Sequence, residues 1–202
     1  CYRRPMQRPD QQRRPASYDD LIKLPAHLVG EILDGELYAS PRPAPRHASA
    51  SSGLGGALHG PFDRGRGGPG GWRMLDEPEL HLGPDVLVPD LAGWRRERLP
   101  QLPERAYFTL APDWVCEVLS PSTAKRDRGD KRRLYARHNI KHYWIVDPVA
   151  RLIEALALRD GEWVDAGVYD DEDESARIPP FDAVEIPVSR LFLPRPPGEE
   201  ED

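Results

Sequence analysis

One apolar segment with a carboxylate at its centre constrains the fold of this chain more than any other feature. Residues 113–120 read Asp-Trp-Val-Cys-Glu-Val-Leu-Ser, which has the length and residue types of a buried strand. Glu117 interrupts that strand, and an unpartnered carboxylate in an apolar core is costly or takes up a proton. Glu117 therefore needs a cation, a set of hydrogen bonds or a metal ion beside it.

A second acid follows an apolar stretch earlier in the chain. Residues 85–90 read Asp-Val-Leu-Val-Pro-Asp, and we expect a strand over 85–91 that presents Asp90 at its end. Two carboxylates of this kind are suitable ligands for a hard divalent cation. Asp90 and Glu117 are therefore a candidate metal site, although Asp90 could only begin a turn and Glu117 could be a buried acid paired with an arginine.

The segment after the Glu117 strand is strongly basic. Residues 125–141 hold eight Lys or Arg against two Asp, although the net charge of the whole chain is -6. Apolar residues at helical spacing predict a helix over 127–138, with Asp127 as its N-cap and Asn139 as a left-handed stop. A basic helix beside two acids suits a phosphate better than a sugar, which favours nucleic acid as the substrate.

The remaining segments predict a mixed α/β domain. A hairpin is expected over 31–38, because Asp34-Gly35 suits a two-residue type I′ turn. A helix of small residues is expected over 46–59, and residues 92–112 are expected to be a connection of loop and helical turn. Further strands are predicted at 72–75, 80–82, 114–119, 141–147, 152–158, 162–169 and 183–186, before a short helix over 187–192.

The length of 202 residues allows one domain with a full core. We expect a disordered basic arm over 1–16, a domain over 17–192 and a disordered acidic tail over 193–202. No apolar run approaches the ~18 residues of a membrane span, and no signal-peptide pattern is present. With only two cysteines, the sequence predicts a cytoplasmic protein without a disulfide or a membrane contact.

Seven short motifs are spread over roughly residues 18–192, and the most specific is Glu-Val-Leu-Ser-Pro-Ser-Thr at 117–123. The others are Glu31-Ile-Leu-Asp-Gly-Glu-Leu, Pro45-Arg-His47, Pro89-Asp90, Asp127-x-Gly-Asp-Lys131, Leu134-Tyr-Ala136 and Tyr143-Trp-Ile-Val-Asp-Pro148. Together they resemble the Uma2 family of restriction endonucleases, in the PD-(D/E)XK nuclease superfamily. The resemblance implies a restriction-endonuclease-like α/β fold, with a central mixed β-sheet flanked by helices, and a magnesium- or manganese-dependent endonuclease acting on DNA.

The resemblance also implies roles for the matching residues. Asp90 and Glu117 would bind the metal ion, and Lys131 would hold the attacking water or stabilise the oxyanion. Glu36 would add an outer carboxylate to this catalytic set. Contacts with nucleic acid are expected from His47, Ser120, Ser122, Lys125, Arg132 and Arg133.

One position departs from the superfamily pattern. That pattern has a lysine two residues after the second acid, where this chain has Leu119. The resemblance makes Lys131, from the following helix, the best replacement and Lys125 the second. Lys131 could instead only pair with Asp127, four residues before it on the same helix.

The expected partner is DNA, and no small-molecule organic cofactor is expected. A homodimer is a further expectation, since two cuts on a duplex suit two copies, and the hairpin at 152–169 is one contact surface. The alternative to a nuclease is a non-catalytic nucleic-acid-binding or partner-binding module on the same fold.

Overall fold

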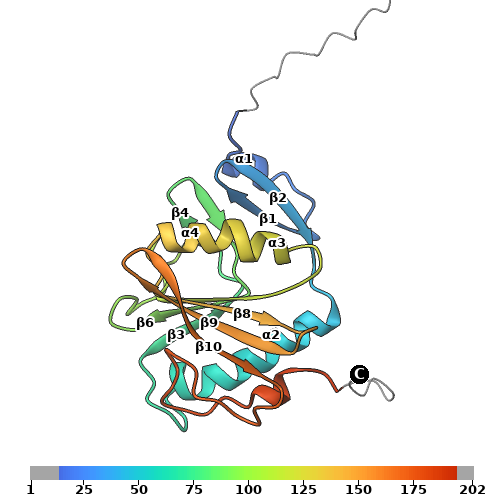
Figure 1. The fold of residues 1–202 in the computed structure, drawn as a ribbon. Helices are drawn as coiled ribbons and strands as arrows, with labels where there is room; N and C mark the ends of the chain where they lie inside the picture. Colours follow the sequence, from blue (N-terminus) through green and yellow to red (C-terminus); the bar gives the residue numbers. More distant parts are fainter. Residues whose placement is uncertain (1–13, 195–202) are drawn as a thin grey trace, which may run out of the picture.

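Two β-sheets form the framework of the protein (Figure 1), in a computed structural model that describes residues 14–194. The larger sheet has the order β10-β9-β8-β7-β6-β3; β7 and β8 pair in parallel and the other neighbours pair antiparallel. Its strands are β3 (Trp72–Asp76), β6 (Leu91–Arg95), β7 (Trp114–Val118), β8 (His142–Asp147), β9 (Leu152–Arg159) and β10 (Glu162–Asp170). The smaller sheet is antiparallel and has the order β2-β1-β5-β4. Its strands are β1 (Leu28–Leu33), β2 (Glu36–Pro41), β4 (Leu80–Leu82) and β5 (Asp85–Leu87).

Helices cover both faces of the larger sheet (Figure 1). The helical segments are α1 (Tyr18–Leu21), α2 (Pro45–Leu58), η1 (His59–Asp63), α3 (Ala124–Arg126), η2 (Asp127–Lys131), α4 (Arg132–Arg137) and η3 (Val188–Leu191). Because successive side chains of a strand point to opposite faces, Cys116 packs with the α2 core and Val115 with the α4 core. Glu117 has the same parity as Val115, so its side chain faces α4. In residues 14–194, no helix has the length and apolar content needed to cross a membrane.

Several predicted elements are confirmed. The β1–β2 hairpin turns at Asp34 and Gly35 with φ of 49° and 81°, the left-handed pair of a type I′ turn. The predicted helix of small residues is α2, and Asn139 ends the basic helix with φ of 59°. The predicted arm and tail lie almost entirely outside the described residues; of the arm, Ala16 donates a 2.7 Å backbone hydrogen bond to Gly35. The predicted homodimer stays a prediction.

Two predicted strands are wrong. The strand expected over 85–91 is two strands in different sheets, β5 and β6, because Pro89 has no N–H with which to continue a ladder. Asp90 therefore stands just before β6 and does not end a strand, and 91–95, expected as strand end and connection, is β6 itself. Residues 183–186 form no strand; a single bridge joins Ala176 to Ile186.

The basic helix begins earlier than predicted. Helical structure runs from Ala124 to Arg137, so Asp127 is an internal residue and not an N-cap. The turn at Asp127–Lys131 is π-helical, a form that often occurs at functional sites. Both end residues of this turn are buried, which directs a carboxylate and an ammonium toward the sheet.

His142, at the start of β8, should make the fold sensitive to acid. Burial, and then the charges of Arg95 and Arg159, lower the pKa of this imidazole to about 4. A lowered folded-state pKa means that the unfolded chain binds the proton more tightly, so stability falls as the pH decreases from about 6.5 toward 4. We expect His142→Gln to flatten the decline of the urea midpoint over this range, and His27→Gln, at an exposed position, to leave it unchanged. An equal decline in His142→Gln and wild type would contradict this role.

Candidate active site

Asp90 and Glu117 lie side by side, Asp90 directly before β6 and Glu117 within β7. Leu91 pairs with Cys116 in the antiparallel β6–β7 ladder, so one residue further along each strand Asp90 comes opposite Glu117. The backbone N–H of Val118 donates a 2.7 Å hydrogen bond to Asp90 Oδ2. Both acids line a cavity of about 260 Å³, which we call the acid cavity. The structure therefore brings together the two residues predicted as metal ligands.

Lys131 reaches the same cavity from the π-helical turn η2. Its Nζ lies 2.9 Å from Glu117 Oε1 and 3.8 Å from Asp127 Oδ1, and only 3% of Lys131 is exposed. Leu119, which stands where the superfamily pattern has its lysine, is buried in the core on the α4 side. The helix thus supplies the cation that the strand lacks, and Lys131 does more than pair with Asp127.

Glu31 is a residue of the site that the sequence reasoning missed. It comes from β1 and is buried, and its Oε1 lies 2.8 Å from Lys131 Nζ and accepts a 2.9 Å hydrogen bond from Val88 N–H. The signal was present, because Glu31 begins an apolar run just as Glu117 interrupts one. Glu36, the acid chosen instead, is exposed; it accepts a 2.8 Å hydrogen bond from Tyr38 and does not line the acid cavity.

Tyr135 is the second missed residue. Its buried hydroxyl donates a hydrogen bond to Glu117 Oε1, the oxygen that also accepts a hydrogen bond from Lys131. Lys131 and Tyr135 are four residues apart and so project from one face of the helix. A tyrosine in the motif Leu134-Tyr-Ala136 looks like an ordinary core residue in sequence, and only the buried partner shows its second role.

The charges of the acid cavity are unbalanced. Burial raises the pKa of Glu117 well above its usual range; Lys131 opposes this, and Asp127, Asp90 and Glu31 add to it. Burial also favours loss of the Lys131 proton, but the surrounding carboxylates raise the pKa of Lys131 well above its usual value. Four acids thus share one permanent cation, and the cluster holds a proton or attracts a further cation.

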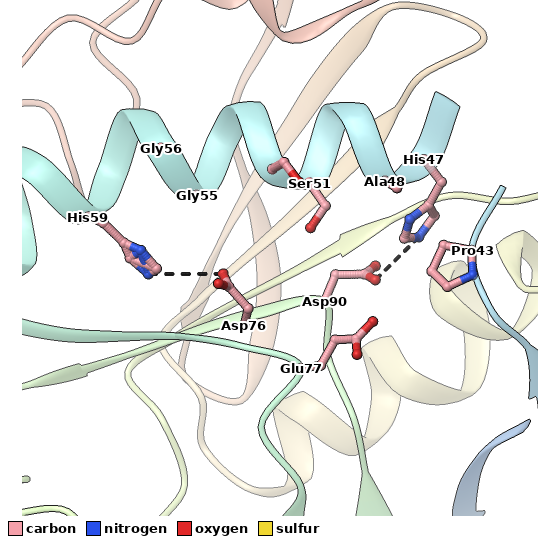
Figure 2. Close-up of a pocket in the computed structure, with 11 residues that line it drawn as sticks. Pro43, His47, Ala48, Ser51, Gly55, Gly56, His59, Asp76, Glu77 and Asp90 are labelled. Carbon is pink, nitrogen blue, oxygen red and sulfur yellow. Dashed lines mark ion pairs between the residues drawn. The ribbon is translucent and has the colours of Figure 1, made fainter. Parts of the chain in front are cut away.

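His47 connects the acid cavity to helix α2. It lies in the first turn of α2, and its Nε2 is 3.2 Å from Asp90 Oδ1; Figure 2 shows the two side chains pointing toward each other. Burial disfavours the protonated imidazole, but the hydrogen bond and charge of Asp90 prevail and raise the pKa of His47. His47 therefore orients Asp90 and lowers the negative charge around it.

Three of the residues predicted to contact nucleic acid lie at or next to the mouth of the acid cavity. Ser120 and Ser122 line it, and their Oγ atoms are 3.1 Å apart. Lys125 is exposed in the helical turn that follows them. Arg42, which the sequence reasoning did not single out, also lines the mouth.

Two other predicted contacts lie away from this mouth. Arg133 is paired with Asp34 at 2.8 Å, and neither Arg132 nor Arg133 lines the acid cavity. Arg128 is paired with Glu154 at 2.6 Å. Much of the local positive charge counted in the sequence is therefore engaged in ion pairs and does not form an open basic face.

The oxygen donors of the acid cavity suit a hard divalent cation. Asp127 is 1% exposed, and its Oδ1 has no hydrogen-bond partner among residues 14–194. Within the same described range, no three His, Cys, Asp or Glu side chains converge as a complete ligand set. Magnesium is commonly held by one or two carboxylates, with water and phosphate oxygens as its other ligands. The pair Asp90 and Glu117 fits that mode of binding, and a closed cage of protein ligands does not.

The mixed sheet flanked by helices, with one acid just before β6 and another within β7, defines an α/β protein of the restriction-endonuclease-like class. A family model described as "Putative restriction endonuclease" matches residues 16–189, and the chain therefore belongs to the Uma2 family. A crystal structure from Anabaena variabilis ATCC 29413, described as "a putative nuclease belonging to DUF820", has the same fold with a TM-score of 0.70 and 23% identity. The match covers 88% of this chain and 97% of that one. No curated protein matches the chain.

Proposed function

We propose that this protein is a magnesium- or manganese-dependent endonuclease that hydrolyses phosphodiester bonds in DNA. The observation that carries the proposal is the buried contact of Lys131 with Glu117, beside Asp90, at the wall of the acid cavity. A lysine and two acids suit metal-assisted phosphodiester hydrolysis, and membership of a restriction-endonuclease family supports the same reaction class.

The side chains of the acid cavity have different roles in hydrolysis. Asp90 and Glu117 would hold a divalent ion, whose chemistry is to polarise the phosphate and to lower the pKa of water. Lys131 donates hydrogen bonds to the phosphoryl oxygens as negative charge develops on them. Glu31 and Tyr135 are positioning residues, because each holds one partner of the Lys131–Glu117 contact.

The mouth of the acid cavity would hold the phosphates on either side of the cleaved bond. Ser120 and Ser122 offer hydroxyl donors there, and Arg42 and Lys125 offer exposed positive charge. Phosphate contacts of this kind fix the register of the strand and carry no sequence information.

Metal-dependent cleavage separates the nuclease from the alternative, a module that binds DNA without cutting it. Purified protein should cleave DNA in the presence of Mg²⁺ or Mn²⁺, and cleavage should stop when EDTA is added. Binding that survives EDTA, with no cleavage at any Mg²⁺ or Mn²⁺ concentration, would favour the non-catalytic module.

Glu31 and Glu36 flank the same hairpin turn and form a matched pair for a test of position. We expect Glu31→Gln to lower the cleavage rate about 10- to 100-fold, the range for groups that orient metal-site residues, because the amide holds Lys131 less strongly. Glu36→Gln should stay within about twofold of wild type, because Glu36 is exposed and outside the acid cavity. Initial rates under identical Mg²⁺ concentrations provide the comparison, and the reverse order of effects would contradict this assignment.

A further inference from the structure

A second cavity opens beside Asp90, between α2 and the end of β3. Its volume is about 340 Å³, and it shares Asp90 and His47 with the acid cavity. We call it the α2 cavity. Figure 2 shows helix α2 along one side, with Asp76 and Glu77 on the other. Whatever binds here lies directly next to the site where we place the cleaved phosphate.

The middle of the α2 wall of this cavity has only small residues. Between His47 and His59 it is formed by Ala48, Ser51, Ser52, Gly55 and Gly56. A Cβ added at Gly55 would come 3.3 Å from Asp76 Oδ1, whereas one added at Gly56 would meet nothing within 4 Å. The helix can therefore lie close to β3 at Gly55, and the space over Gly56 stays open for a ligand.

Glu77 is the unusual residue of this cavity. Its φ is 46°, a left-handed conformation that costs a residue with a Cβ about 1 kcal/mol or more and glycine almost nothing. Its backbone N–H donates a 3.0 Å hydrogen bond to the Asp90 carbonyl, and its side chain lines both cavities. Glu77 also forms a 3.8 Å ion pair with Arg42; both side chains are largely exposed, so this contact contributes little to stability. Backbone strain of this kind is concentrated at functional sites, and here it places the Glu77 side chain at the wall of both cavities.

The three carboxylates of the α2 cavity disfavour a phosphate and suit a base, although His47 and His59 also line it. Asp76, Glu77 and Asp90 repel anions, but carboxylates accept hydrogen bonds from the exocyclic amines of cytosine, adenine and guanine. The volume is at the small end of ligand sites, large enough for one nucleoside and too small for a duplex. A base can enter such a cavity only when it is unpaired, which costs least in single-stranded DNA.

We propose that the α2 cavity binds one unpaired nucleoside next to the cleaved phosphate, with Glu77 accepting a hydrogen bond from the exocyclic amine of its base. This inference rests on the proposed nuclease function and narrows its substrate to single-stranded or frayed DNA. Cytosine, adenine or guanine is preferred to thymine at that position, because thymine has no exocyclic amine.

Nucleotide binding tests the inference without cleavage. The full-length protein is titrated calorimetrically with dCMP and with dTMP in Ca²⁺. We expect dCMP to bind about tenfold more tightly than dTMP. Glu77→Gly should remove this preference and be at least as stable as wild type, because glycine adopts φ of 46° without strain. Gly56→Leu should weaken the binding of both nucleotides at least about tenfold, because the leucine side chain fills the open space. The variant should still fold, because leucine has a higher helix propensity than glycine at this position of α2.

Two matched variants control for these changes. Asp160→Gly relieves the same kind of strain, at φ of 50°, in the β9–β10 turn away from both cavities. Gly129→Leu adds a side chain at another open helical glycine outside the α2 cavity. Both should bind dCMP like wild type. Absence of nucleotide binding by wild type, or wild-type binding by Gly56→Leu, would overturn the inference, and a preference retained in Glu77→Gly would overturn the role of that side chain.

Cleavage assays separate failure of this inference from failure of the proposed function. We expect wild type to cleave single-stranded oligonucleotides faster than matched duplexes. The rate at which Gly56→Leu cleaves the single strands should be at least about tenfold lower than that of wild type. If wild type cleaves both forms and Gly56→Leu is equally active, the inference fails and the nuclease stands. If wild type cleaves neither form, the nuclease proposal fails, and dCMP binding decides what the α2 cavity recognises.

Discussion

Glu117→Gln should lower the rate of DNA cleavage by at least about 10³-fold and leave the fold at least as stable as wild type. The amide loses the charge that holds a divalent ion, and metal-ion and electrostatic stabilisation supply much of the rate of phosphodiester hydrolysis. The amide oxygen can still accept the hydrogen bonds from Lys131 and Tyr135. Removing a buried negative charge among three other acids offsets the weaker contact with Lys131.

Single-turnover cleavage with Mg²⁺ and urea unfolding provide the two measurements for this variant. Asp90→Asn should behave in the same way, because Asp90 is the other predicted ligand. Glu162→Gln, at an exposed position of β10, is the control and should match wild type in both measurements. Full activity in Glu117→Gln would show that this carboxylate takes no part in the reaction.

Lys131→Met should destabilise the fold by about 3–5 kcal/mol at pH 7, the usual range when one partner of a buried ion pair is removed. Methionine fills the space of the lysine stem but leaves the carboxylates of Glu31, Glu117 and Asp127 without their cation. The loss should shrink at low pH, because protonated carboxyls no longer repel one another. DNA cleavage should also be lost under conditions in which Lys131→Met is still folded. Urea unfolding across pH provides the measurement.

A matched lysine and a combined variant show whether the destabilisation comes from the buried acids. Lys125→Met, at an exposed position, should change stability by no more than about 0.5 kcal/mol. Glu31→Gln combined with Lys131→Met should recover part of the lost stability, because one repelling charge is removed. Wild-type stability of Lys131→Met at pH 7 would show that Lys131 does not hold these acids together.

The central strand and its acid could be predicted because the constraint on them is local. Glu117 stands within an apolar run, so the sequence itself requires a compensating group. The family resemblance pointed to Lys131, and its Nζ lies 2.9 Å from Glu117 Oε1. Asp90 was also predicted, although Pro89 places it before a strand and not at the end of one. Neither inference needed knowledge of distant packing.

The choice between Glu31 and Glu36 could not be made from the sequence alone. Both acids belong to one hairpin, and the buried face of that hairpin depends on how the smaller sheet packs against the basic helix. The expected nucleic-acid contacts of the basic helix could not be located from the sequence, for the same kind of reason. A charge count cannot show that Arg128 and Arg133 are engaged by acids distant in sequence, Glu154 and Asp34.

Anomalous diffraction from a crystal soaked in Mn²⁺ tests most directly whether the carboxylates of Asp90 and Glu117 jointly bind an ion. Our account predicts one strong manganese peak in the acid cavity, about 2.1 Å from an oxygen of Asp90 and an oxygen of Glu117. A manganese peak elsewhere, or none at this position under saturating Mn²⁺, would contradict it.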